Sequence, residues 1–124
     1  MVRKAAEIIQ HAEQNLRRAR DAGARIAAGS DAGTPFNGHG GFAYEVELLH
    51  TMLGMSPREA LRAATATAAE LLGVPRGTLG VGDVADLLVL ERDIDDDIRA
   101  LAGPALVIKE GLVVARRSPH GGAA

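Results

Sequence analysis

One short apolar segment, RIAAGS at residues 25–30, constrains the possible fold more than any other feature. It is bounded by glycine and turn-forming residues, as buried strands often are, although a run this short is also compatible with a helix. A buried parallel strand needs neighbouring strands on both sides. The rest of the first 75 residues reads as helix and supplies none. The sequence therefore predicts an α/β fold in which this strand belongs to a larger sheet.

Helical patterns surround this segment. Residues 3–22 carry apolar side chains at the spacing of one helix face: Ala5, Ile8, Ile9, Ala12 and Leu16. A second helix is expected over 41–53. Ser56, Pro57 and Glu59 form a helix-start signal in which serine caps the helix and glutamate returns the hydrogen bond. That helix is expected to reach residue 64, and a short helix capped by Thr65 or Thr67 is expected before Gly73 and Pro75.

The pattern changes to strands after Pro75. Residues 85–90 predict a strand, and an acidic loop with one helical turn follows. Residues 106–109 and 112–115 predict a hairpin joined through Glu110 and Gly111. The tail, residues 118–124, is expected to be disordered.

Composition excludes several classes of function. The chain has 124 residues and no cysteine, so disulfides, thiolate zinc sites and a cysteine nucleophile are excluded. The net charge is −2 with both signs interspersed, which predicts no nucleic-acid partner. No stretch approaches the length of a membrane span, and the start lacks an apolar leader region. A cytoplasmic protein without a membrane partner is therefore expected.

Asp31 is the strongest candidate for a functional residue. If 25–30 is a strand, Asp31 lies at its carboxyl end, where catalytic residues of α/β barrels sit. A carboxylate there can bind a divalent metal or accept a proton from an activated water. The sequence Asp-Ala-Gly is also ordinary turn chemistry, and these residues alone leave both readings open.

The histidines and the acidic run give weaker signals. His39 lies in the glycine-rich loop 34–41, where it either contacts a substrate or is solvated. His11 and His50 fit surface or core-edge packing on helices, and His120 lies in the tail. No paired-histidine zinc motif is present. The aspartates of the acidic run lack the spacing of a calcium loop and are expected to form a solvated loop: Asp93, Asp95, Asp96 and Asp97.

Three stretches, taken together and in order, resemble one family. They are GSDAGTP at 29–35, SPREALRAATATAAELLGV at 56–74 and GTLGVGDVADLLVLERD at 77–93, and VIKEGLVVARR adds a similar final hairpin. The chain resembles the C-terminal portion of metal-dependent amidohydrolases, with the closest likeness to the imidazolonepropionase-like and Xaa-Pro or Xaa-Arg dipeptidase-like branch.

The resemblance implies a fold. It is the C-terminal fragment of a (β/α)₈ TIM barrel together with the C-terminal strands of a small β-sandwich. Residues 1–75 would be the end of the barrel, with 25–30 as its eighth strand, and residues 76–117 would be the share of the sandwich. An N-terminal portion of a few hundred residues is expected to be missing, because a barrel needs about 250 residues.

The resemblance also implies the site. Asp31 matches the family's strand-eight aspartate, which binds metal and passes a proton from the attacking water to the leaving group. His39 and Thr34, in the loop that follows, would contact the substrate. The cofactor would be one or two divalent metal ions, zinc by expectation, held only with ligands from the missing portion, because a catalytic zinc normally has about three protein ligands.

The implied function is hydrolysis of C–N bonds in a small amide, cyclic amide or dipeptide. By itself the chain is expected to bind zinc poorly and to be inactive, so a complementing N-terminal barrel portion or a homodimer is the expected partner. The alternative is a non-catalytic remnant or interaction module in which Asp31 has no role.

Overall fold

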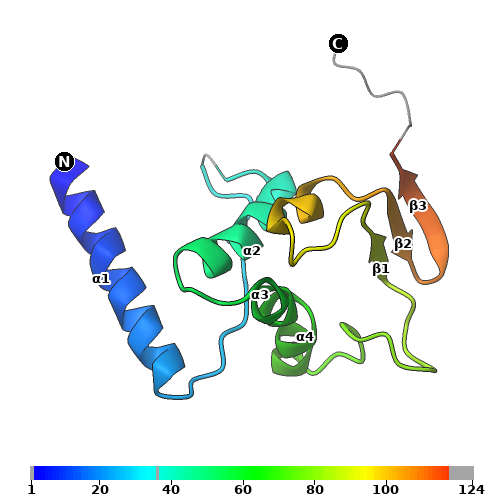
Figure 1. The fold of residues 1–124 in the computed structure, drawn as a ribbon, viewed down its shortest axis with the longest axis horizontal. Helices are drawn as coiled ribbons and strands as arrows, with labels where there is room; N and C mark the ends of the chain where they lie inside the picture. The colour runs from blue at the N-terminus through cyan, green and yellow to red at the C-terminus, as the bar shows by residue number, and fades with distance from the viewer. Residues whose placement is uncertain (1, 36, 118–124) are drawn as a thin grey trace, which may run out of the picture.

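A computed structural model describes residues 2–35 and 37–117. The helices are α1 (Val2–Asp21), α2 (Phe42–Thr51), α3 (Pro57–Ala64) and α4 (Ala66–Leu72), with 3₁₀ turns η1 (His39–Gly41) and η2 (Ile98–Ala102). The strands are β1 (Leu87–Val89), β2 (Leu106–Lys109) and β3 (Leu112–Arg116). Figure 1 shows α1 standing to one side, α2 to α4 in the centre and the sheet on the opposite side. The tail 118–124, with His120, lies outside the described residues.

Local signals set the helix boundaries as the sequence predicts. The Glu59 amide donates to Ser56 Oγ at 3.2 Å, and the Ser56 amide donates to the Glu59 carboxylate at 2.7 Å, which confirms the reciprocal cap of α3. These bonds to Ser56 also hold the pKa of Glu59 below its usual value. Gly73 ends α4 with φ +66°, a left-handed conformation in which glycine has no side chain to strain. The side chain of Thr65 does not cap α4, because its hydroxyl donates to the Leu61 carbonyl.

The core lies between α2, α3 and the acidic loop with η2. Its buried apolar residues come from these elements and the turn between α2 and α3: Val46, Leu49, Leu53, Met55, Ala60, Ala63, Ile94, Ile98 and Leu101. Ala60 has no exposed surface, so α3 approaches α2 closely at this point. Ile26 and Ala28, from the segment that leads to Asp31, pack against this cluster.

The apolar face of α1 is not buried by the part of the chain that the structure describes. Ile8 and Ile9 are 68% and 57% exposed, and Leu16 is 45% exposed. A polar contact near the carboxyl end of α1 joins it to the following elements, where Arg20 donates to the Leu53 carbonyl. Arg17 pairs with Glu13 at 3.0 Å within α1 itself. The sequence predicted this helix and its apolar face, but the described residues do not bury that face.

Residues 25–30 do not form the predicted strand. They run without strand pairing, and their one backbone bond to another element joins the Ala28 amide to the Ala63 carbonyl at 3.0 Å. Ile26 and Ala28 pack against the core, as alternate residues of an extended segment would. Strand structure requires a neighbouring strand, and residues 2–35 and 37–117 place none beside this segment.

The three strands form one antiparallel sheet in the order β1-β2-β3, which confirms a mixed α/β chain with antiparallel strands at its end. Glu110 and Gly111 have φ of +51° and +82°, as a two-residue hairpin turn requires. Strand β1 covers only the centre of the predicted segment 85–90.

Asp86 ties the hairpin turn to the start of β1. Its carboxylate accepts from Lys109 Nζ at 2.8 Å and from the Glu110 amide at 2.8 Å, and it also accepts from Arg76. The bond from Lys109, followed by those from Glu110 and Arg76, holds the pKa of Asp86 far below its usual value. Arg76 also reaches the Glu110 carboxylate at 2.8 Å, so one ion network joins three segments.

Exchanging Asp86 for asparagine is expected to lower the melting temperature of the sheet at neutral pH and to reduce its sensitivity to acid. A carboxylate whose pKa falls on folding stabilises the fold above its unfolded value, about 3.9, and this contribution is lost as the pH falls through the folded value. The difference in melting temperature between wild type and Asp86→Asn should thus be largest above about pH 4 and should become smaller below it. Thermal unfolding from pH 7 to pH 2 measures this. In a Lys109→Met background, the melting-temperature difference caused by Asp86→Asn should be smaller. Equal pH profiles of the melting temperature for wild type and Asp86→Asn would contradict the prediction.

Candidate active site

Asp31 begins the loop that follows the extended segment 25–30. Its side chain is exposed, and its backbone has φ +48°, in the left-handed region. Aspartate is one of the few residues with a side chain that enter this region readily. The Thr34 hydroxyl donates to the Asp31 carbonyl at 3.2 Å, so the turn is closed by one of the predicted site residues.

The loop is held together by its own hydrogen bonds. The Ala32 amide donates to Ser30 Oγ at 3.3 Å, and the Gly33 amide donates to the Asn37 carbonyl at 2.9 Å. The Asn37 amide donates to the Thr34 carbonyl at 3.0 Å, and the Asn37 side chain donates to the Ser30 carbonyl. Sequence reasoning missed Asn37. The available signal was its residue type, because asparagine side chains often bond to nearby backbone in turns.

The side chain of His39 contacts the beginning of this loop. It starts η1, and its imidazole lies against Gly33, where an added Cβ would stand 3.5 Å from Nε2. Gly33 has φ +98°, a conformation that favours glycine. The structure therefore gathers the three predicted site residues, Asp31, Thr34 and His39, on one exposed loop.

Asp31 supplies one donor of the kind that a divalent metal needs. In the described part of the chain, no three histidine, aspartate or glutamate side chains come together to hold a metal ion. A carboxylate oxygen suits zinc, but a catalytic zinc site normally has about three protein ligands. The described residues therefore fit one position of a metal site and do not complete it.

Two of the remaining histidines have other surroundings. Nδ1 of His50 lies 2.6 Å from the Met55 carbonyl, so the ring of this half-buried residue ties α2 to the turn that follows it. His11 is exposed on α1. Both observations agree with the packing and surface roles predicted for these residues.

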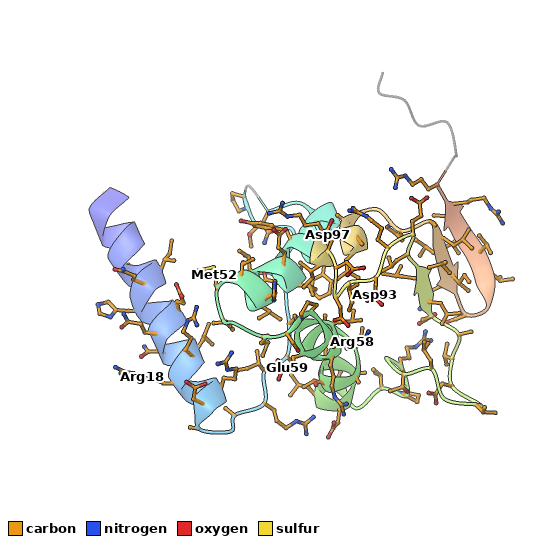
Figure 2. All side chains as sticks on the ribbon, in the orientation of Figure 1. Arg18, Met52, Arg58, Glu59, Asp93 and Asp97 are labelled. Atoms are coloured by element: carbon orange, nitrogen blue, oxygen red, sulfur yellow. The ribbon has the colours of Figure 1, made fainter. Side chains whose placement is uncertain are left out.

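Three aspartates of the acidic loop, Asp93, Asp95 and Asp97, are paired with arginines. Arg58 of α3 reaches Asp95 at 2.6 Å and Asp93 at 3.7 Å, and Figure 2 shows Arg58 beside this loop. Asp97 pairs with Arg92 at 2.9 Å and accepts from the Arg99 amide at the start of η2. The loop is exposed, as predicted, and its partners are arginines of this chain.

Within the described ranges, none of the helices combines the length and apolar character that a bilayer crossing requires. Comparison with curated proteins gives no match. The sequence profile of the amidohydrolase family matches residues 1–114.

Solved structures give closer likenesses. A putative prolidase from Bifidobacterium longum is 48% identical, with a TM-score of 0.77 over 83% of this chain and 26% of that one. A Xaa-Pro dipeptidase with methionine bound in its active site is 30% identical, with a TM-score of 0.74 over 85% of this chain and 25% of that one. A prolidase complexed with N-methylphosphonate-L-proline is 31% identical, with a TM-score of 0.77 over 94% of this chain and 29% of that one.

The chain thus spans about a quarter of the length of these structures. The profile, however, covers nearly all of it, and the loop with Asp31 lies inside the matched range. The antiparallel sheet and the helices correspond to part of the amidohydrolase fold. The chain belongs to the amidohydrolase family.

Proposed function

We propose that the chain forms the C-terminal end of the barrel (residues 1–75) and the sandwich strands (residues 76–117) of a metal-dependent amidohydrolase. Its reaction is the hydrolysis of a C–N bond in a dipeptide or a similar small amide. Family membership supports the reaction class, and the prolidase and Xaa-Pro dipeptidase likenesses support a dipeptide substrate. A cytoplasmic location is part of the same proposal.

The position of Asp31 carries this proposal. Asp31 follows an extended segment that packs on the core, and its carboxylate lies on an exposed loop. A hydrogen-bonded turn holds the backbone beside it. In this setting the carboxylate can serve as one metal ligand and as an acceptor for a proton. A bound divalent cation, zinc by our proposal, would lower the pKa of a coordinated water and so supply the nucleophile.

Thr34 and His39 are proposed to contact the substrate. The Thr34 hydroxyl faces the backbone of Asp31, and the His39 ring lies against Gly33, so both are within the loop that starts at the carboxylate. A histidine in this place can donate a hydrogen bond to a carboxylate or carbonyl oxygen of a dipeptide.

The remaining metal ligands are proposed to come from a complementing N-terminal barrel portion. Exposed apolar surface supports this. A groove of about 520 Å³ runs between the helices and the sheet and is lined mainly by aliphatic residues: Leu61, Leu79, Leu87, Leu88, Leu90, Leu101, Val107 and Ile108. Ile8, Ile9 and Leu16 of α1 are exposed as well, and exposed apolar patches often mark contacts with another chain.

The alternative is a non-catalytic module that dimerises, and β3 favours it. Strand β3 pairs on one side only within the described residues, and Leu112, Val113 and Val114 are at least half exposed. Such an edge can pair with a second chain. This function would require nothing of Asp31.

A chimera separates the two functions. We would replace the matched quarter of the Bifidobacterium longum prolidase with this chain and assay Xaa-Pro dipeptide hydrolysis and zinc content. The chimera is expected to bind zinc and turn over, whereas the 124-residue chain alone is expected to do neither. A folded chimera that binds no zinc and has no activity would contradict the proposed enzyme, and a dimeric chain would then favour the module.

A further inference from the structure

The hydrogen bonds of the loop after Ser30 converge on one residue. Asn37 uses three of its polar groups within this loop. Its main-chain carbonyl accepts from the Gly33 amide, and its main-chain amide donates to the Thr34 carbonyl. Its side-chain amide donates to the Ser30 carbonyl. The Ser30 carbonyl belongs to the peptide group that leads into Asp31. Asn37 therefore bonds both to the residue before the turn, Ser30, and to residues within it, Gly33 and Thr34.

Asp31 needs such support. Few residues with a side chain adopt a φ of +48°, and although aspartate does so more readily than most, contacts from the surrounding structure stabilise this conformation. The Thr34 hydroxyl fixes the carbonyl of Asp31, but the peptide before it is fixed by Asn37. The direction of the Asp31 carboxylate depends on both.

The His39 ring closes the loop from the other side. It lies against Gly33, whose amide is the one that donates to Asn37. Gly33 is thus held between the Asn37 carbonyl and the imidazole. Asn37 therefore bonds to the peptide group before Asp31, and Asn37 and His39 together contact Gly33, two residues after it.

We propose that Asn37 is a positioning residue that sets the orientation of the Asp31 carboxylate. The effect of Asn37 on catalysis depends on the proposed function. Its effect on the order of the loop does not. The side chain at this position must donate to a carbonyl, as the Asn37 side-chain amide does. A carboxylate at residue 37 cannot donate and would bring a negative charge against the Ser30 oxygen.

The test is Asn37→Asp in the 124-residue chain, followed by amide hydrogen exchange using NMR. We expect the Gly33 amide to exchange about tenfold faster in the variant, since one hydrogen bond of the loop is lost and another is strained. The matched control is Asn15→Asp, the same change of group on the exposed surface of α1. Amides of α3 should keep their protection in both variants, which shows that the fold is intact.

The catalytic consequence is measured in the prolidase chimera. Asn37→Asp should lower kcat about tenfold or more with KM changed less than twofold, whereas Asn15→Asp should change neither. An unchanged Gly33 exchange rate would overturn the proposal, and so would a loosened loop with full kcat. If the chimera itself has no activity, the proposed function fails, and the exchange result still decides whether Asn37 orders the loop.

Discussion

Replacing Asp31 with asparagine in the prolidase chimera is expected to reduce kcat by about 10²–10⁴-fold, the usual contribution of a positioned acid or base. Asparagine keeps the size of the side chain and tolerates the left-handed backbone that the structure gives to residue 31. It removes the negative charge and the ability to accept and release a proton. The zinc content of the chimera should fall as well, because one ligand is weakened.

The control is Asp96→Asn, which neutralises an exposed carboxylate in the acidic loop. It is expected to leave kcat and zinc content unchanged. If Asp31→Asn retained full activity, the carboxylate would have no part in the reaction, and the turn reading of Asp-Ala-Gly would be sufficient. Circular dichroism of both variants should match the parent, since neither change touches the core.

Replacing Leu53 with alanine is expected to cost about 2–5 kcal/mol of folding free energy. Leu53 is 4% exposed and belongs to the buried core cluster of the described residues, so truncation leaves a cavity among its neighbours. A small protein is stable by only about 5–15 kcal/mol, so this single change removes a large share of it. Urea unfolding followed by the helical circular dichroism signal measures the shift of the midpoint.

Leu72→Ala is the matched control for this change. It removes the same atoms from a side chain that is 73% exposed at the end of α4. Surface substitutions of this kind usually stay within about 0.5 kcal/mol. Equal midpoints for the two variants would show that the cluster around Leu53 does not stabilise the helices.

Features that depend on neighbouring residues were predicted well from the sequence. The cap of α3 requires only Ser56 and Glu59, and the hairpin requires only two residues that accept positive φ. Gly23 and Gly54 end their helices with φ of +88° and +67° for the same local reason. These rules act over three to five residues, so a single sequence contains all of the information.

Features that depend on distant partners were predicted only in part. The pattern of residues 25–30 indicates a strand, but a strand exists only when another one pairs with it, and none lies beside this segment in the described residues. The apolar face of α1 likewise indicates burial that this chain does not provide. The apolar pattern in both segments agrees with that of a longer protein, whereas their conformation in the structure depends on the contacts that this chain itself supplies.

The candidate site divides in a similar way. Asp31, Thr34 and His39 were predicted because their residue types have chemical roles and their order matches a family motif. Asn37 was not, because an asparagine in a glycine-rich loop has many possible partners and sequence alone does not choose among them. The arginine partners of the acidic loop were missed for the same reason, since Arg58 lies more than thirty residues from Asp93 in the chain.

The separation of the sheet from the helical core has a consequence for how the chain unfolds. None of the buried core residues lies on β1, β2 or β3, and the strands pack chiefly on one another. Two regions that share little buried surface need not lose their structure together. The sheet should therefore open at lower urea concentration than the helices, and the connecting residues 73–86 should be cut first by a protease. One melting temperature would then describe neither region, because the all-or-none assumption behind it does not hold.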